Sequence, residues 1–392
     1  MELKVKRRRR VLGDALTAVA LCAIFACSGN TNTTGPAPPL PTGQNGSLNL
    51  YATTNAGCYV SDNIVCTGNP SGTAAVTALG TDYVSSTASY ILVGDKAGNV
   101  TAWTTNGVNQ PATSTPCSSG VTTPITGVTA YVNGTTNNDV YFVSGTTLYL
   151  NSGTSAPCSA GTTTTRSTLP NGSVVGLSLA NGYLYGVSAQ GKYFSVAAGT
   201  LPSSISYSSL PNIPSTASIG GVTADRNNIV FVTDHANNAI YAFYANSNGT
   251  LTAINGNLTS NADISSPRAI TTVYALNPTS NYCTAGPCEF LYVTNYSNAI
   301  AQFVLSVNAN GASSSVGYNE FNAPYYQCEI INPIAMASFS DAGAESGIGN
   351  TGTATVPYVF LGQDGTTSGP CFTVGSTSTF GNGVTAYIPY GE

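Results

Sequence analysis

The side chains best suited to catalysis are one histidine, the aspartate directly before it and an arginine further along the chain. His235 is the only histidine among the 392 residues, Asp234 precedes it directly, and Arg268 follows further along the chain. A histidine or carboxylate can activate water as a general base or acid, and an arginine can hold a carboxylate or a developing oxyanion. His235, Asp234 and Arg268 are therefore the candidate catalytic residues.

These residues also have a purely structural interpretation. Aspartate and asparagine are favoured in hairpin bends because their side chains bond the local backbone, and "TDHANN" has the composition of such a bend. The sequence contains no GxSxG elbow, HExxH motif, phosphate-binding loop or EF-hand-like spacing. With one histidine and no CxxC pair, it also lacks the ligands of a typical zinc site. We expect neither a metal nor another cofactor.

The elements that position these residues are predicted to be strands. Hydrophobic residues make up 42% of the chain and charged residues 7%, which allows a sizeable core and excludes disorder driven by charge. The 42 glycines and 21 prolines favour many short strands, and no sustained helical period follows residue 40. The sequence predicts an all-β fold.

A repeat organises these strands. Its clearest copy is "FLYVTNYSNAIAQF" at 290–303, which reads as a strand, a tight turn and a second strand. Segments similar to the first strand of this copy begin near residues 50, 91, 141, 184, 230, 291 and 359. All but the first follow a shorter apolar element, with the sequences AVTA at 75, GVTA at 127, GLSL at 176, GVTA at 221, AITT at 269 and IAMA at 334.

The unit near residue 50 lacks this short element, and the C-terminus can supply it. "GVTAYIPY" at 383 repeats the "GVTAY" at 127 over five positions, so we expect the two termini to complete one blade together. Closing a ring removes exposed sheet edges and lets each blade pack against two neighbours. The sequence thus predicts a seven-bladed β-propeller of four-stranded antiparallel blades, closed by N- and C-terminal strands. A six-bladed ring with an extra hairpin is the alternative.

The segment "FLYVTN" at 290–295 resembles the YVTN repeat of surface-layer and lactonase-like β-propellers. "FVTDHANNAIYAF" at 231 looks like a second good copy, and the resemblance extends over about 48–392. It implies the propeller fold. The family includes both sugar-acid lactonases and proteins without known catalysis, so the resemblance does not imply a reaction.

In such a blade, the turns between the second and third strands share one face with the connections that lead to the next blade. We expect this face to gather the candidate catalytic residues and a set of binding residues around the mouth of the central channel. The predicted binding residues are Asp95, Lys96, Asn295, Tyr296, Glu329 and Asp364.

The N-terminus has the features of an export signal. The basic stretch "MELKVKRRRR" precedes a short apolar segment that ends in Ile24-Phe25-Ala26-Cys27, which resembles a bacterial lipobox. We expect residues 1–27 to form a lipoprotein-type signal peptide, with Cys27 acylated at a membrane. Residues 28–46 are rich in Pro, Gly and Thr and are expected to form a flexible tether, and residues 47–392 a single propeller domain. Ordinary secretory cleavage and an uncleaved anchor are the alternatives.

Removing residues 1–27 leaves five basic and 14 acidic residues, a formal net charge of −9. A nucleic-acid partner requires a basic surface, which these numbers exclude.

The cysteines indicate an oxidising compartment. Eight remain after Cys27, namely Cys58, Cys66, Cys117, Cys158, Cys283, Cys288, Cys328 and Cys371. An even number in an exported chain indicates disulfides. Cys58–Cys66 and Cys283–Cys288 are close enough in sequence to staple local loops. Cys117 and Cys158 lie in the near-copies "TSTPCSSG" and "TSAPCSAG", so we pair them, and pair Cys328 with Cys371 by exclusion.

The sequence therefore favours a non-catalytic, lipid-anchored protein of the bacterial cell envelope, on its periplasmic or surface side. Its propeller would bind a protein or glycan partner. The alternative is a lactonase-like hydrolase of a small sugar-derived acid lactone, with His235 and Arg268 at the channel mouth.

Overall fold

The computed structural model describes 17 stretches between residues 47 and 388. They are residues 47–51, 64–67, 75–85, 88–105, 111–117, 120–133, 137–153, 157–158, 163–170, 174–254, 264–275, 288–295, 299–307, 313–321, 333–339, 358–363 and 384–388. The predicted signal peptide with Cys27 and the predicted tether lie outside them. Within the described part of the chain, no helix has the length and apolarity needed to cross a membrane.

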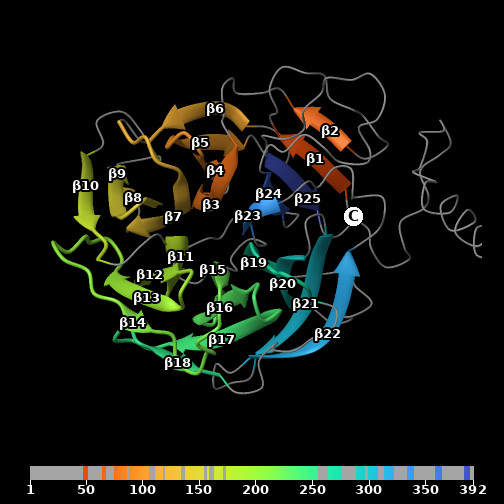
Figure 1. Cartoon of the computed structure of the whole chain (residues 1–392). Helices are drawn as coiled ribbons and strands as arrows, with labels where there is room; N and C mark the ends of the chain where they lie inside the picture. Colours follow the sequence, from red (N-terminus) through yellow and green to blue (C-terminus); the bar gives the residue numbers. More distant parts are fainter. Residues whose placement is uncertain are drawn as a thin grey trace, which may run out of the picture.

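The described strands form six sheets that surround a common axis (Figure 1). The first blade contains β3 (Val76–Ser85), β4 (Ala88–Asp95), β5 (Val100–Thr105) and β6 (Pro111–Pro116). The second contains β7 (Ile125–Asn133), β8 (Asn137–Ser144), β9 (Thr147–Gly153) and β10 (Thr163–Thr168). The third contains β11 (Val174–Ala180), β12 (Tyr183–Ser188), β13 (Lys192–Ala197) and β14 (Ser208–Ser209).

The remaining blades follow the same plan. The fourth contains β15 (Ile219–Ala224), β16 (Ile229–Asp234), β17 (Ala239–Ala245) and β18 (Leu251–Ala253). The fifth contains β19 (Ile270–Ala275), β20 (Cys288–Asn295), β21 (Ala299–Val307) and β22 (Ser313–Phe321). The sixth contains β23 (Pro333–Phe339), β24 (Tyr358–Gln363), β25 (Val384–Ile388), β1 (Ser47–Tyr51) and β2 (Ile64–Thr67).

The first strands of the blades form the inner ring. Each contacts the first strand of the next blade, in the order β3, β7, β11, β15, β19 and β23, and β23 returns to β3. These are the six short apolar elements found in the sequence, and each pairs antiparallel with the longer strand that follows it. The all-β propeller prediction is therefore confirmed.

The predicted number of blades and the role of the C-terminal strand need correction. β25 pairs with β24 on one side and with β1 on the other, so it is the third strand of the sixth blade rather than the first strand of a seventh. The unit near residue 50 adds β1, and β2 pairs parallel to β1. The described strands thus support the six-bladed alternative. The "GVTAY" identity misled because the same alternation of apolar and small residues suits an inner strand and a middle strand equally.

The cores lie between neighbouring blades. Between the third and fourth blades, Tyr185 and Val187 of β12 pack in one cluster with Val230 and Val232 of β16 and with Phe243 of β17. A similar cluster joins the fourth and fifth blades. Each blade is therefore stabilised by burying its apolar face on the next, which is why the ring must close.

A β-bulge recurs at the start of five inner strands. The pairing register shifts between Val76 and Ala78, Ile125 and Gly127, Val174 and Gly176, Ile219 and Gly221, and Pro333 and Ala335. A bulge bends and twists the strand where it occurs. The repeated bulge therefore shapes the same end of the channel in each of these blades.

Candidate functional site

In the fourth blade, the turn between the second and third strands contacts both neighbouring inter-blade connections. The backbone N–H of Ser218, in the connection to the fourth blade, donates to Asp234 Oδ1 at 2.9 Å. In the same region, the backbone N–H of Ser266 donates to Asn238 Oδ1 at 2.8 Å. Turns between second and third strands thus lie beside the inter-blade connections, as the sequence analysis predicts.

The carboxylate of Asp234 is used by its own turn. It is fully buried, and Oδ1 also accepts the backbone N–H groups of Ala236 and Asn237. Oδ2 accepts the side-chain amide of Asn237 at 2.7 Å and the hydroxyl of Tyr241 at 3.3 Å. These contacts are those expected of a residue that shapes a bend.

His235 and Arg268 both lie on this face. His235 is half-buried, and its backbone N–H donates to Ser218 O at 3.0 Å. The side chain of Arg268 is exposed, while its backbone oxygen accepts the hydroxyl of Thr233. Between these two residues, both within the described ranges, no hydrogen bond or ion pair occurs. The catalytic role remains a prediction.

Asp95 repeats the arrangement of Asp234 in the first blade. Its Oδ1 accepts the backbone N–H groups of Ala97 and Asn99, and Oδ2 accepts the side-chain amide of Asn99 at 2.8 Å. Lys96 beside it is exposed. Asn295 ends β20, and only its backbone is described. Tyr296, Glu329 and Asp364 lie outside the described residues.

A disulfide joins Cys117 and Cys158, whose Cα atoms are 4.4 Å apart. It links the end of the first blade to the second blade and is the pair that the near-copies predict. Cys66 and Cys288 lie in strands of which only the backbone is described, and Cys58, Cys283, Cys328 and Cys371 lie outside the described residues.

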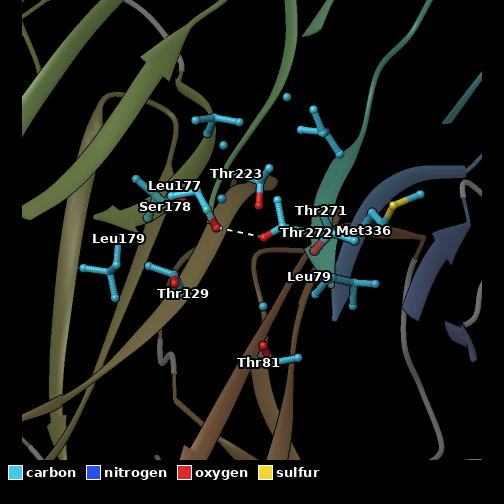
Figure 2. Close-up of a pocket in the computed structure, with 18 of the residues that line it drawn as sticks. Leu79, Thr81, Thr129, Leu177, Ser178, Leu179, Thr223, Thr271, Thr272 and Met336 are labelled. Atoms are coloured by element: carbon cyan, nitrogen blue, oxygen red, sulfur yellow. Dashed lines mark hydrogen bonds between the residues drawn. The ribbon is translucent and has the colours of Figure 1, made fainter. Parts of the chain in front are cut away.

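A cavity of about 390 Å³ lies in the central channel (Figure 2). Its wall is formed by the six inner strands. Two positions after the bulge glycines Gly127, Gly176 and Gly221 stand Thr129, Ser178 and Thr223, and all three line the cavity. Figure 2 shows these hydroxyl side chains together with Leu79, Leu177, Leu179 and Met336 around one space.

Several of the channel hydroxyls also connect neighbouring blades. Thr81 donates to the backbone oxygen of Ser338 at 2.8 Å, and Thr272 donates to that of Ala224 at 2.9 Å. The hydroxyls of Thr271 and Ser338 are 2.9 Å apart. A hydroxyl that donates to the wall retains lone pairs that can accept a hydrogen bond from a ligand. The middle of the channel is thus polar but uncharged.

A charged group lies at the opposite end of the channel from the predicted face. Asp225 follows β15, and Glu289 is the second residue of β20, where it pairs with Tyr274 at the end of β19. Both residues line the cavity, and each is only 5% exposed. Asn227 bridges them, because its backbone N–H donates to Asp225 Oδ1 at 2.8 Å and its side chain to Glu289 Oε2 at 3.0 Å.

Arg226 completes this group. Its guanidinium carbon lies 3.6 Å from the centre of the Tyr274 ring, a cation–π geometry, and its side chain is exposed at the end of the cavity. Its backbone N–H also bonds Glu289. The positive charge of Arg226 therefore lies close to two buried carboxyl groups.

Burial dominates the titration of both acids. Desolvation is the largest cause that raises the pKa of Glu289 to about 8, and the negative charge of Asp225 raises it too, whereas Arg226 and the hydrogen bonds from Arg226 and Asn227 lower it. Desolvation also raises the pKa of Asp225 to about 6 against the opposing effect of its hydrogen bonds and Arg226. At neutral pH the pair therefore retains a proton, held mainly by Glu289.

Sequence reasoning missed this group because it assigned the site to the other end of the channel. A usable signal existed. Only 7% of the residues are charged. Asp225-Arg226 directly follow the short element of one unit, and Glu289 directly precedes the longer strand of the next unit, so all three lie between the first and second strands of consecutive units. Burying an acid costs free energy unless the acid is paired, so a buried acid beside a cavity is a candidate for a functional site.

Comparisons with known proteins identify no family for this chain. No protein-family model matches it, and no curated protein matches it significantly. Solved structures similar to it include a streptogramin B lyase, with 12% identity, a TM-score of 0.43, and coverage of 74% of this chain and 76% of that one. The Malassezia sympodialis allergen Mala s 1 has 12% identity and a TM-score of 0.47, covering 79% and 91%. A catalytically inactive virginiamycin B lyase from Staphylococcus aureus with quinupristin has 12% identity and a TM-score of 0.46, covering 90% and 98%.

Proposed function

We propose that this protein is a non-catalytic, lipid-anchored envelope protein whose propeller binds a glycan in its central channel. The observation that carries the proposal is the cavity of about 390 Å³, whose wall is lined by hydroxyl groups, glycines and small apolar side chains. Its volume falls in the range of small-molecule sites. Hydroxyls such as those of Thr129 and Thr223 can exchange hydrogen bonds with sugar hydroxyls, and Met336 can contact the apolar face of a sugar ring.

The structural use of the predicted catalytic residues supports the non-catalytic part of this proposal. All described acceptor contacts of Asp234 go to its own turn, to Tyr241 and to the neighbouring connection, so the carboxylate that a base or an orienting group for His235 would need is already hydrogen-bonded. The resemblance to the YVTN repeat agrees with either a scaffold or an enzyme. Anchoring through Cys27, an envelope location on the periplasmic or surface side, and the absence of a nucleic-acid partner remain part of the proposal.

Isothermal titration calorimetry with the 2-hydroxyethyl glycosides of glucose, galactose and mannose tests it. We expect the native chain to bind at least one of them. Thr129→Trp should remove that binding by filling the channel. The control Thr252→Trp, at an exposed position in β18 on the outside of the fourth blade, should leave it unchanged. An absence of binding by the native chain, or equal binding by the Thr129→Trp variant, contradicts the proposal.

A lactonase-like hydrolase is the second candidate, and one observation favours it. Asp225 and Glu289 have pKa values raised to about 6 and about 8, so one is ionised and the other protonated near pH 7, as a general base and a general acid require. Assaying a panel of sugar-acid lactones with the native chain, Glu289→Gln, His235→Ala and Arg268→Ala separates the candidates. Hydrolysis lost in any of these variants supports an enzyme, and no hydrolysis by the native chain supports the binding protein.

A further inference from the structure

Three aspartates of this propeller shape turns in the same way, but one of them differs in a single contact. Asp95, Asp234 and Asp225 are all buried, and each accepts backbone N–H groups of its own turn through Oδ1. In the first two, Oδ2 accepts the side-chain amide of an asparagine in the same turn, namely Asn99 or Asn237. These two carboxylates are therefore fully used by the fold.

At Asp225 the asparagine of the turn is shared with an acid of the next blade. The side-chain amide of Asn227 donates to Glu289 of the next blade at 3.0 Å and also interacts with Asp225, so it is shared between the two acids. Asp225 Oδ2 is left buried with no hydrogen-bond partner among the described residues, although Asp225 is 95% buried and lines the channel. A buried carboxylate oxygen without a partner costs considerable free energy, so such an atom beside a cavity indicates a ligand that donates to it.

The charges around this oxygen indicate which donor it would accept. Asp225 and Glu289 interact unfavourably when both are ionised, and their pKa values are raised despite the nearby Arg226. The guanidinium of Arg226 lies against the Tyr274 ring, at an exposed position. The site therefore holds a proton near neutral pH, and a group that brings both a positive charge and several N–H donors can replace that proton.

We propose that the Asp225–Glu289 end of the channel is a subsite for an ammonium group, which makes an amine-bearing carbohydrate the preferred class of ligand. This inference rests on the proposed function, since it assumes that a sugar occupies the adjacent channel. The ammonium group donates to Asp225 Oδ2 and to Glu289, while the sugar hydroxyls contact the threonines and serines of the inner strands. Asn227 keeps the two carboxyl groups in place by bonding both.

Matched probes test this directly. The 2-aminoethyl and 2-hydroxyethyl glycosides of glucose, galactose and mannose have the same sugars and linkers and differ only in the terminal amine or hydroxyl. Titration calorimetry of the full chain at pH 7 should show the aminoethyl form binding about 10- to 100-fold more tightly than the hydroxyethyl form, as expected for hydrogen bonds to a charged group. Asp225→Asn and Glu289→Gln should each reduce this preference at least several-fold.

Asp139→Asn is the matched control. Asp139 is a buried acid at the same end of the second blade, only 4% exposed, and it does not line the cavity. Its substitution should leave the preference for the amine intact. If Asp225→Asn fails to fold, Glu289→Gln, which retains the shape of the side chain, decides the question.

The outcomes separate the two proposals. Equal binding of the two kinds of glycoside by the native chain overturns the ammonium subsite and leaves the glycan-binding channel standing. A preference that survives Glu289→Gln, or that is lost equally in Asp139→Asn, also overturns the subsite. If neither kind of glycoside binds, the proposed function fails, and the subsite fails with it.

Discussion

The side-chain amide of Asn227 donates a 3.0 Å hydrogen bond to Oε2 of Glu289, which connects a turn of the fourth blade to the second strand of the fifth. This contact is what distinguishes the Asp225 turn from the otherwise similar turns at Asp95 and Asp234. Through this hydrogen bond, the turn that contains Asp225 is joined to Glu289 of the next blade, and both acids line the channel.

The burial of Glu289 should make the protein less stable as the pH rises. Its pKa is raised to about 8, whereas a glutamate in an unfolded chain has a pKa of about 4.3. The folded state therefore binds the proton more tightly, and this contribution to stability is present at about pH 4 and is lost as the pH rises towards 8. Glu289→Gln should remove a decline on the order of 2 kcal/mol in the free energy of unfolding.

Urea unfolding of the native chain and of Glu289→Gln at pH 5 and pH 8 measures this difference. Lys192→Gln, an exposed substitution in the third blade, serves as the control and should follow the native chain. If Glu289→Gln loses as much stability between the two pH values as the native chain, the carboxyl group is not the source of the decline.

Asp234 and His235 should differ sharply in their importance to stability. Asp234 is fully buried and accepts hydrogen bonds from several groups, so Asp234→Ala leaves buried donors without a partner and should cost about 2–4 kcal/mol. His235→Ala should change the free energy of unfolding by less than about 1 kcal/mol, since its side chain is half-buried and makes no described hydrogen bond. Equal costs in chemical denaturation would refute the assignment of Asp234 to the turn.

Gly221 should be intolerant of any side chain. A Cβ atom at this position would lie 2.5 Å from the backbone oxygen of Arg268, so Gly221→Ala forces β15 away from the start of β19. We expect a loss of about 1–3 kcal/mol, as in other overpacked cores. Differential scanning calorimetry should show a lower Tm for Gly221→Ala and an unchanged Tm for Ser208→Ala, an exposed substitution in β14. A native Tm for Gly221→Ala would show that the inner strands do not approach this closely.

The Cys117–Cys158 disulfide should stabilise the join between the first two blades. It closes a loop with a sequence separation of 41 residues, for which loop-closure entropy predicts about 4 kcal/mol. The double variant Cys117→Ser/Cys158→Ser should unfold at lower urea concentration. Mass spectrometry of peptides from the unreduced native chain should contain the Cys117–Cys158 cross-link. Another partner for either cysteine would contradict the pairing.

Much of the fold can be predicted from the sequence because the repeat is visible at the level of strands. The six short elements before the longer strands became β3, β7, β11, β15, β19 and β23, in order. The number of blades in the ring was harder to predict. Whether β25 is an inner or a third strand depends on its pairing with β24 and β1, and alternation of apolar residues carries no information about that choice.

The candidate site was less accessible to sequence reasoning. Turn aspartates such as Asp95, Asp225 and Asp234 look alike in the sequence, since each precedes one or two asparagines within the next four positions of a polar bend. What distinguishes Asp225 is a contact between Asn227 and Glu289, which are 62 positions apart. Only the ring brings those residues together, and a single sequence does not reveal such a pair.

A crystal structure of the full chain soaked with a 2-aminoethyl glycoside is the most direct test of the central claim that the channel binds a carbohydrate. We expect a sugar ring between Thr129, Ser178 and Thr223 of the inner strands, with the amine of the aminoethyl group within hydrogen-bonding distance of Asp225 Oδ2. A sugar bound on the outer strands or beside His235 and Arg268, with the channel free of ligand, would contradict it.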